Sequence, residues 1–203
     1  MRNIWKRYVF GIGALVLALV SGSAFAWPCD FLTGGGFIIN PTSTSNGAKA
    51  NFGVGGGCKD GATTWGHLEY IDHGRGLNVH WTSITAYIEL ESNTDSRGRL
   101  IGVRGICGKA RTNLYGPDDV DFLVVARDAG EPGVLDEFDI RLAQNGLIVY
   151  STEFFHFRHK LNDGIGGGGN IQLHKPNPST TGNFTSNPPD PSSCPAWFAR
   201  VPA

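Results

Sequence analysis

Apolar side chains alternate with polar or small ones along most of this chain, and this alternation limits the possible folds more than any other feature. In residues 76–81, for example, Leu77, Val79 and Trp81 share one side. A period of two residues is typical of a half-buried β-strand. Such segments lie at 50–54, 76–81, 83–90, 120–127, 137–142, 147–151, 153–159 and 170–175.

Clusters of Gly, Asn, Asp and Pro separate these segments, and no stretch outside the first 26 residues carries a helical period. About ten strands at a spacing of 8–12 residues are typical of an all-β sandwich or barrel. Ten strands also need two packed faces to bury their apolar sides. We therefore expect one all-β domain over residues 27–175, an antiparallel β-sandwich or jelly roll.

The first 26 residues have the pattern of a secretory signal peptide. Arg2, Lys6 and Arg7 precede a mostly apolar run over residues 8–20, and residues 24–26 form a small-x-small cleavage site. The run is short for a membrane span of about 20 residues. We expect a secreted protein, in the periplasm, at the cell surface or outside the cell, with no membrane segment after cleavage.

The charge of the mature chain argues against nucleic acid as a partner. The signal peptide holds three of the 17 Lys and Arg residues, which leaves 14 basic against 18 acidic residues and a formal charge of −4. No basic patch stands out, and phosphate-rich partners need one. The partner is unknown at this point; a polysaccharide or another surface protein would suit the composition.

Four cysteines lie in the mature chain, and none has a Cys-x-x-Cys spacing. An even count in an exported protein predicts two disulfides and allows three pairings. We expect Cys29 with Cys194 and Cys58 with Cys107, because the first bond would tie both termini together. Residues 176–203 hold seven of the 11 prolines and predict an irregular tail, pinned to the body by Cys194.

Two glycine clusters, residues 53–58 and 164–170, resemble phosphate-binding loops only superficially, because no strand and helix flank them. We read them as flexible turns, so they imply no cofactor. His67 and Glu69 point the same way on a strand. Together with a distant histidine such as His156 or His174 they imitate an iron-binding triad; the alternative is a polar outer face of the sheet.

Residues 127–142 carry five carboxylates around a Gly-Glu-Pro-Gly turn between two strands. Pro and Gly at these positions are typical of chain reversal, which makes the stretch a hairpin connection. Asp128, Glu131 and Asp136 could alternatively converge on calcium, which takes flexible oxygen ligands. A catalytic role for these acids is a third reading.

Three hypotheses for the function follow. The first is a non-catalytic extracellular or cell-surface module, structural or adhesive, because the sequence lacks a recognisable nucleophile, metal motif or cofactor loop. The second is a carbohydrate-binding module that presents exposed aromatic side chains: Trp65, Tyr70, Trp81 and Tyr87. The third is a secreted hydrolase that uses Asp or Glu, whose paired carboxylates a linear sequence cannot reveal.

Several short stretches together resemble a family of exported β-rich domains found in bacterial choice-of-anchor-type surface and secreted proteins. The resemblance implies a secreted or surface β-domain, and it carries over no catalytic residue. The chain departs from the family in its cysteines and in its long Pro-rich tail. The matching stretches are Gly34-Gly35-Gly36, Phe52-Gly53, Gly66 through Asp72, Val79-His80, Asp128 through Ile140, and Gly168 through His174.

Overall fold

The structure is a computed structural model that describes residues 29–40, 47–59, 62–116, 119–152, 159–165, 167–177 and 194. The predicted signal peptide lies outside these ranges, as do most of the predicted tail and residues 153–158 of an expected strand. No helix in the described part of the chain is long and apolar enough to cross a membrane.

The described residues form an antiparallel all-β structure, which confirms the prediction from the alternating pattern. Neighbours in the sheet follow the order β10-β1-β2-β3-β4-β5-β6-β7-β8, and β9 pairs with β7. Each strand from β1 to β7 therefore lies beside its successor in the chain, and β10 returns to pair with β1. The strands are β1 (Phe31–Asn40), β2 (Ala48–Lys59), β3 (Ala62–Asp72), β4 (Leu77–Thr94), β5 (Leu100–Thr112), β6 (Val120–Asp128), β7 (Glu137–Gln144), β8 (Leu147–Ser151), β9 (His159–Lys160) and β10 (Gly167–His174).

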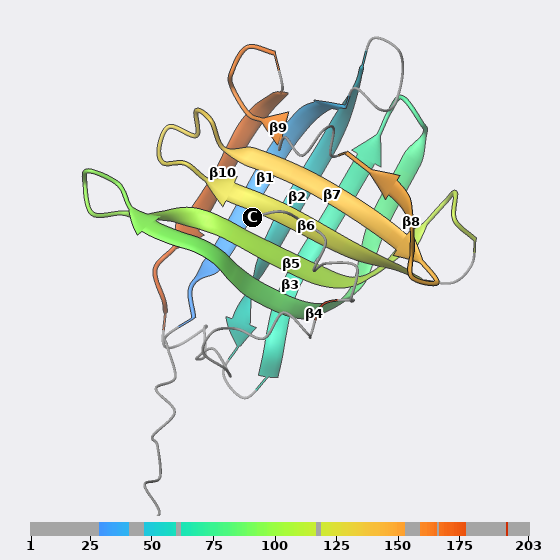
Figure 1. Ribbon diagram of the computed structural model, residues 1–203, viewed down its shortest axis with the longest axis horizontal. Helices are drawn as coiled ribbons and strands as arrows, with labels where there is room; N and C mark the ends of the chain where they lie inside the picture. The colour runs from blue at the N-terminus through green and yellow to red at the C-terminus, as the bar shows by residue number, and fades with distance from the viewer. Residues whose placement is uncertain are drawn as a thin grey trace, which may run out of the picture.

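The sheet curls into two layers because β4 is long and irregular. Its first residues, Leu77–His80, pair with β3, and register shifts against β5 follow at Trp81/Ser83 and Ile84/Ala86. Such bulges bend a strand and increase its twist, so β4 passes from the first layer into the second. Figure 1 shows β5, β6 and β7 crossing in front of β1 and β2. The arrangement agrees with the predicted sandwich-like fold.

Side chains from both layers meet in the core between them. Phe52 of β2 stacks on Phe138 of β7 with ring centroids 3.9 Å apart, and the ring of Tyr70 on β3 lies 6.2 Å from Phe138. Phe138, Ile140 and Leu142 are all fully buried, on the side that the alternation predicts. Burying a side chain of this size contributes roughly 1.5–3 kcal/mol, so these contacts hold the two layers together.

A second, smaller apolar cluster lies on the outward side of β4 to β7. We call it the apolar face; it consists of Ala86, Ile88, Val103, Cys107, Leu123, Val125 and Ala143, with Cys194 packed against them. Leu123 and Val125 are 1% and 7% exposed although they point away from the core. This side of the second layer is therefore covered, which explains why the central strand β6 is apolar on both faces.

Two disulfides form, as predicted, but the predicted pairing is wrong. Cys29 bonds Cys58 and Cys107 bonds Cys194, with Cα–Cα distances of 5.8 and 5.7 Å. The register of β1 and β2 places Phe31 opposite Gly57, so Cys29 arrives beside Cys58. Cys58 points into the core and Cys107 into the apolar face. Cys58 and Cys107, which were expected to pair, thus lie on opposite sides of the sheet.

Candidate functional site

The acidic stretch connects β6 to β7 and lies along the open edge of β10. Each of two carboxylates there accepts a backbone N–H of β10: Asp128 Oδ2 from Leu173 at 2.7 Å, and Asp136 Oδ2 from Ile171 at 2.8 Å. Their other oxygens accept N–H bonds from the loop itself, at Gly130 and Ala129. We call these two acids the carboxylate clasp. It occupies the place of a further strand and protects the edge of the sheet.

The clasp is buried, and burial raises the pKa of both acids. The pKa of Asp128 lies above its ordinary value, and that of Asp136 rises to about 6. Glu131, the third predicted calcium ligand, instead approaches the side-chain amide of Asn170 at 3.4 Å. No group of three or more Asp, Glu, His or Cys side chains in the described ranges is arranged to hold a metal ion. A calcium site here stays a prediction.

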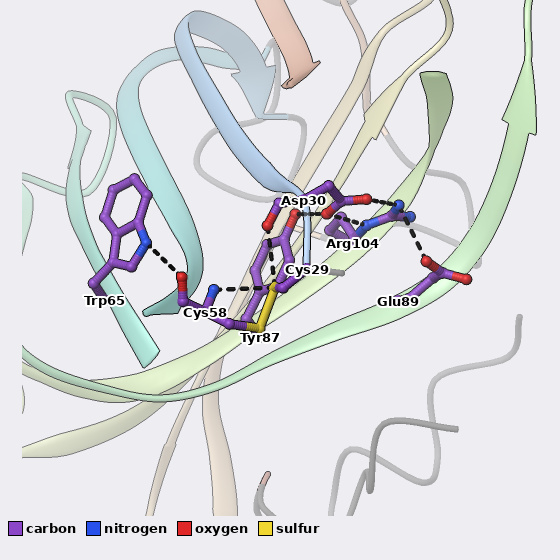
Figure 2. Close-up of a disulfide and its surroundings, with 7 residues drawn as sticks. All are labelled: Cys29, Asp30, Cys58, Trp65, Tyr87, Glu89 and Arg104. Carbon is purple, nitrogen blue, oxygen red and sulfur yellow. Dashed lines mark hydrogen bonds and ion pairs between the residues drawn. A yellow bond between two sulfur atoms is a disulfide. The ribbon is translucent and has the colours of Figure 1, made fainter. Parts of the chain in front are cut away.

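Two of the four aromatic side chains predicted to contact a glycan are buried, so that prediction is wrong for them. Tyr87 is 4% exposed, and its hydroxyl donates to Asp30 at 2.6 Å near the Cys29–Cys58 disulfide (Figure 2). Tyr70 is fully buried and its hydroxyl lies 2.6 Å from that of Tyr150. Burial raises the pKa of both tyrosines well above the ordinary value. Their hydroxyls are partnered inside the protein and meet no ligand.

The two tryptophans are half-buried and lie on different sides of the sheet. Trp65 donates its indole N–H to the Cys58 carbonyl at 3.0 Å, and its ring lies 5.9 Å from Phe31 on the outward side (Figure 2). Trp81 packs against the core cluster. Because they face opposite ways, the predicted aromatics do not form one platform for a ligand.

The outward side of β10, β1, β2, β3 and the start of β4 is polar and rich in glycine. We call it the glycine face. Residues across it fall into rows set by the strand register. Its residues are Phe31, Thr33, Gly35, Phe37, Asn51, Gly53, Gly55, Gly57, Trp65, His67, Glu69, Ile71, Asn78, His80, Gly168, Asn170, Gln172 and His174.

An aromatic ring covers three of these glycines. A Cβ added to Gly55 would meet the imidazole of His67 at 2.7 Å, and one on Gly168 would meet the ring of Phe37 at 2.9 Å. Gly57 lies under Trp65 and Phe31 in the same way. At these positions the absence of a side chain has a plain structural reason, because the neighbouring ring occupies the space.

Gly35 and Gly53 differ, because no side chain of the described residues covers them. They lie opposite each other in β1 and β2. A Cβ on Gly53 would meet nothing within 4 Å, and one on Gly35 only the Phe52 carbonyl at an ordinary 3.5 Å. Neither has a positive φ. Glycine inside a strand lowers stability by roughly 0.5–1 kcal/mol relative to alanine, so packing does not explain these two glycines. We call the pair the floor.

Hydrogen-bonding side chains border the floor in its own row. Asn170 of β10 lies opposite Gly35, and Glu69 of β3 lies opposite Gly53. Glu69 also contacts Nδ1 of His80 on β4. Asn170, Glu69 and His80 are all exposed. The floor is therefore bare backbone between an amide on one side and a carboxylate–imidazole pair on the other.

The rows of residues on either side of the floor add further hydrogen-bonding side chains. His67 is exposed beside the floor, and Gln172 is exposed on β10. Thr33 lies next to them and shares a hydrogen bond of 2.8 Å with Nε2 of His174. The His67–Glu69 pair that imitates an iron triad thus belongs to this polar face, while the third expected member, His174, is stacked on Phe31 at 4.4 Å.

Sequence reasoning missed the floor. The Gly53–Cys58 cluster was read as a turn, yet these residues lie within strand β2. A signal was present: glycine inside a strand often marks a place where a ligand or another backbone approaches closely. No protein-family model, no curated protein and no solved structure matches this chain.

Proposed function

We propose that this protein is an exported, non-catalytic adhesive module that holds its partner on the glycine face. One observation carries the proposal: Gly35 and Gly53 leave backbone open at the centre of an exposed polar face, with no packing reason for their lack of side chains. Glycine in such a position allows another molecule to approach the backbone closely.

Several buried acids of the described chain have structural partners, which supports a module without catalysis. Asp128 and Asp136 hold the edge of β10. Asp139 accepts a hydrogen bond from Thr152 at 2.9 Å and contacts Nδ1 of His159 at 2.7 Å. Asp30 is paired with the buried Arg104. A hydrolase needs two carboxylates free to act in a cleft. Asp128 and Glu131 do line one pocket, but each oxygen of Asp128 already accepts a backbone N–H.

Export is part of the proposal. Two disulfides are compatible with an oxidising compartment outside the cytoplasm. N-terminal sequencing of protein recovered from the culture fluid or cell surface should begin at Trp27. Recovery of the chain in the cytoplasm with Met1 at its start would contradict export.

The adhesive role is tested by retention of fluorescently labelled mature protein on intact cells and extracellular matrix of the producing organism. We expect retention of the parent protein and a loss of at least tenfold for Gly53→Val and Gly35→Val. Thr85→Val is the matched control, because Thr85 is exposed in β4 outside the glycine face. Equal retention of all variants, or steady turnover in glycosidase and esterase screens, would overturn the proposal.

A further inference from the structure

We infer that the ligand of the glycine face is a neutral polysaccharide chain that lies across the strands, with one row of side chains as its binding track. The inference rests on the proposed function and names the chemistry of the partner. We call the row the track; it runs from His80 and Glu69 over Gly53 and Gly35 to Asn170.

The track has the length and shape for an extended chain. It crosses five neighbouring strands, β4, β3, β2, β1 and β10. Strands in a sheet lie about 4.8 Å apart, so four intervals span about 19 Å, which is room for several sugar units. The centre of the track is low because the floor has no side chains, and both of its ends carry exposed polar groups.

The track continues beyond β10 into a pocket. Glu131, which approaches Asn170 at 3.4 Å, also lines a pocket of about 220 Å³ together with Gln172 and Lys175. Lys175 is exposed at the end of β10. A chain that leaves the floor at Asn170 therefore reaches a second concave region and is not stopped at the sheet edge.

The groups along the track fit hydroxyls better than any other ligand chemistry. The amides of Asn170 and Gln172 and the imidazole of His67 each can donate and accept hydrogen bonds. A sugar hydroxyl also does both, so each of these groups can be satisfied by a chain of hydroxyls. The 40%-exposed Ile71 borders the floor in the next row and offers apolar contact to the flat side of a sugar ring. Phe37 lies in the same row, but the ammonium of Lys49 lies over its ring, 4.3 Å from the centroid.

Charge and polarity argue against the other classes of partner. The five residues of the track include one carboxylate, Glu69, in contact with His80, and no Lys or Arg. Basic side chains, Arg99 and Lys175, line only the adjoining pocket, where the carboxylates of Asp128 and Glu131 also lie. Binding of a nucleic acid depends on cationic groups that neutralise phosphates. A protein interface usually centres on buried aromatic or Arg anchors, whereas the centre here is bare backbone. A neutral, hydroxyl-rich chain is what remains.

The experiment is affinity gel electrophoresis of the mature protein in gels that contain β-glucan, mannan, xylan or starch, with polygalacturonate as the acidic comparison. We expect at least one neutral polysaccharide to retard the parent protein, with affinity that is insensitive to salt between 50 and about 500 mM because no ion pair is involved. Gly53→Val should reduce the affinity at least tenfold, and Gly53→Ala by less, since a methyl group fills less of the floor.

Two further variants locate the ligand on the track. Asn170→Ala and His67→Ala should each weaken binding by roughly two- to tenfold, the effect of one hydrogen bond. Thr85→Val should bind like the parent, and thermal melts of all variants check that they are folded. These results would place the polysaccharide on the floor and its borders.

Two outcomes would overturn the inference, and they differ from failure of the proposed function. If no neutral polysaccharide retards the protein while its retention on cells still depends on Gly53, the adhesive role stands and the ligand is not a neutral glycan. If a polysaccharide binds Gly53→Val and the parent equally, a glycan binds elsewhere and the track is not its site.

Discussion

The glycine face and the apolar face lie on the outward sides of the two layers of one curled sheet, and they are built in contrasting ways. Along the apolar face Leu123 and Val125 are buried, and a disulfide fixes Cys194 against them. On the glycine face Gly35, His67 and Asn170 are exposed, and within the described part of the chain no side chain covers the floor. The apolar side of the sheet is therefore buried, whereas the polar side stays exposed.

The largest effect on stability should come from removing the disulfide that holds Cys194 against the apolar face. Cys107→Ser/Cys194→Ser removes a bond that closes a sequence separation of 87 residues, which contributes roughly 4.5 kcal/mol in the chain-entropy model. Urea unfolding should show this loss of stability, and an apolar dye should bind as water and dye reach Leu123 and Val125. Unchanged dye binding would mean that the face stays covered without the disulfide.

The next effect concerns the link between the two layers. Arg104 on β5 is fully buried and pairs with Asp30, which precedes β1, and also lies 3.4 Å from Glu89 (Figure 2). Arg104→Leu leaves Asp30 buried without its charge partner and should lower the free energy of unfolding by about 3 kcal/mol. Urea titration measures the loss.

An exposed ion pair provides the matched control for Arg104. Lys109 contacts Asp121 at 2.5 Å with 44% of the lysine side chain exposed, so Lys109→Leu should cost less than about 1 kcal/mol. The double variant Arg104→Leu/Asp30→Asn should recover part of the loss, because it removes the uncompensated charge. Equal losses for Arg104→Leu and Lys109→Leu would contradict a buried link between the layers.

A smaller effect is expected at the clasp, where the connection between β6 and β7 holds the edge of β10. Because burial raises the pKa of Asp136 to about 6, the folded protein binds this proton more tightly than the unfolded chain. The stability it contributes is fully present below the ordinary pKa of 3.8 and is lost as the pH rises through 6. From pH 5 to pH 7 the free energy of unfolding should therefore fall by about 1 kcal/mol from this group.

Urea titrations of the parent protein and Asp136→Asn at pH 5 and pH 7 isolate the contribution of Asp136. The Asn variant cannot titrate at this position, so its stability should change less between the two pH values. The pKa of Asp128 is raised as well, which is why the difference between the two proteins is the relevant quantity. An identical pH dependence in both would mean that Asp136 has an ordinary pKa.

The floor itself should tolerate substitution, which sharpens the contrast between glycines that packing requires and glycines that it does not. Gly53→Val should keep the stability of the parent or raise it by about 0.5 kcal/mol, because its Cβ meets open space and valine favours strands. Gly36→Ala should destabilise by roughly 1–3 kcal/mol, since its Cβ would overlap the Gly168 carbonyl. A loss for Gly53→Val as large as that for Gly36→Ala would make the floor a structural feature.

The smallest effect is expected from calcium. Each oxygen of Asp128 and of Asp136 already accepts a backbone N–H bond, so each is a weaker ligand for an ion than a free carboxylate oxygen. Thermal melts in chelator, in millimolar calcium and in millimolar magnesium should coincide. A calcium-specific rise of several degrees, absent in Asp136→Asn, would instead show an ion bound at the clasp.

The sequence by itself determined the fold class of this protein. Alternation of apolar residues is a local property, so it identifies strands without knowledge of their neighbours. It also indicated which side of β7 enters the core, because Phe138, Ile140 and Leu142 are buried as expected. An even number of cysteines was enough to predict two disulfides, and Pro and Gly were enough to place the chain reversal after Asp128.

Only the tertiary structure decided which residues meet. Disulfide pairing depends on strand register, which sets Cys29 beside Cys58, and on the side of the sheet to which each cysteine points. The carboxylates of the clasp reach N–H groups 35 and 45 residues away. The floor exists because Gly35 and Gly53 fall opposite each other where no ring covers them. These contacts join residues from different elements of the sheet, and the register that brings them together follows from packing of the whole sheet.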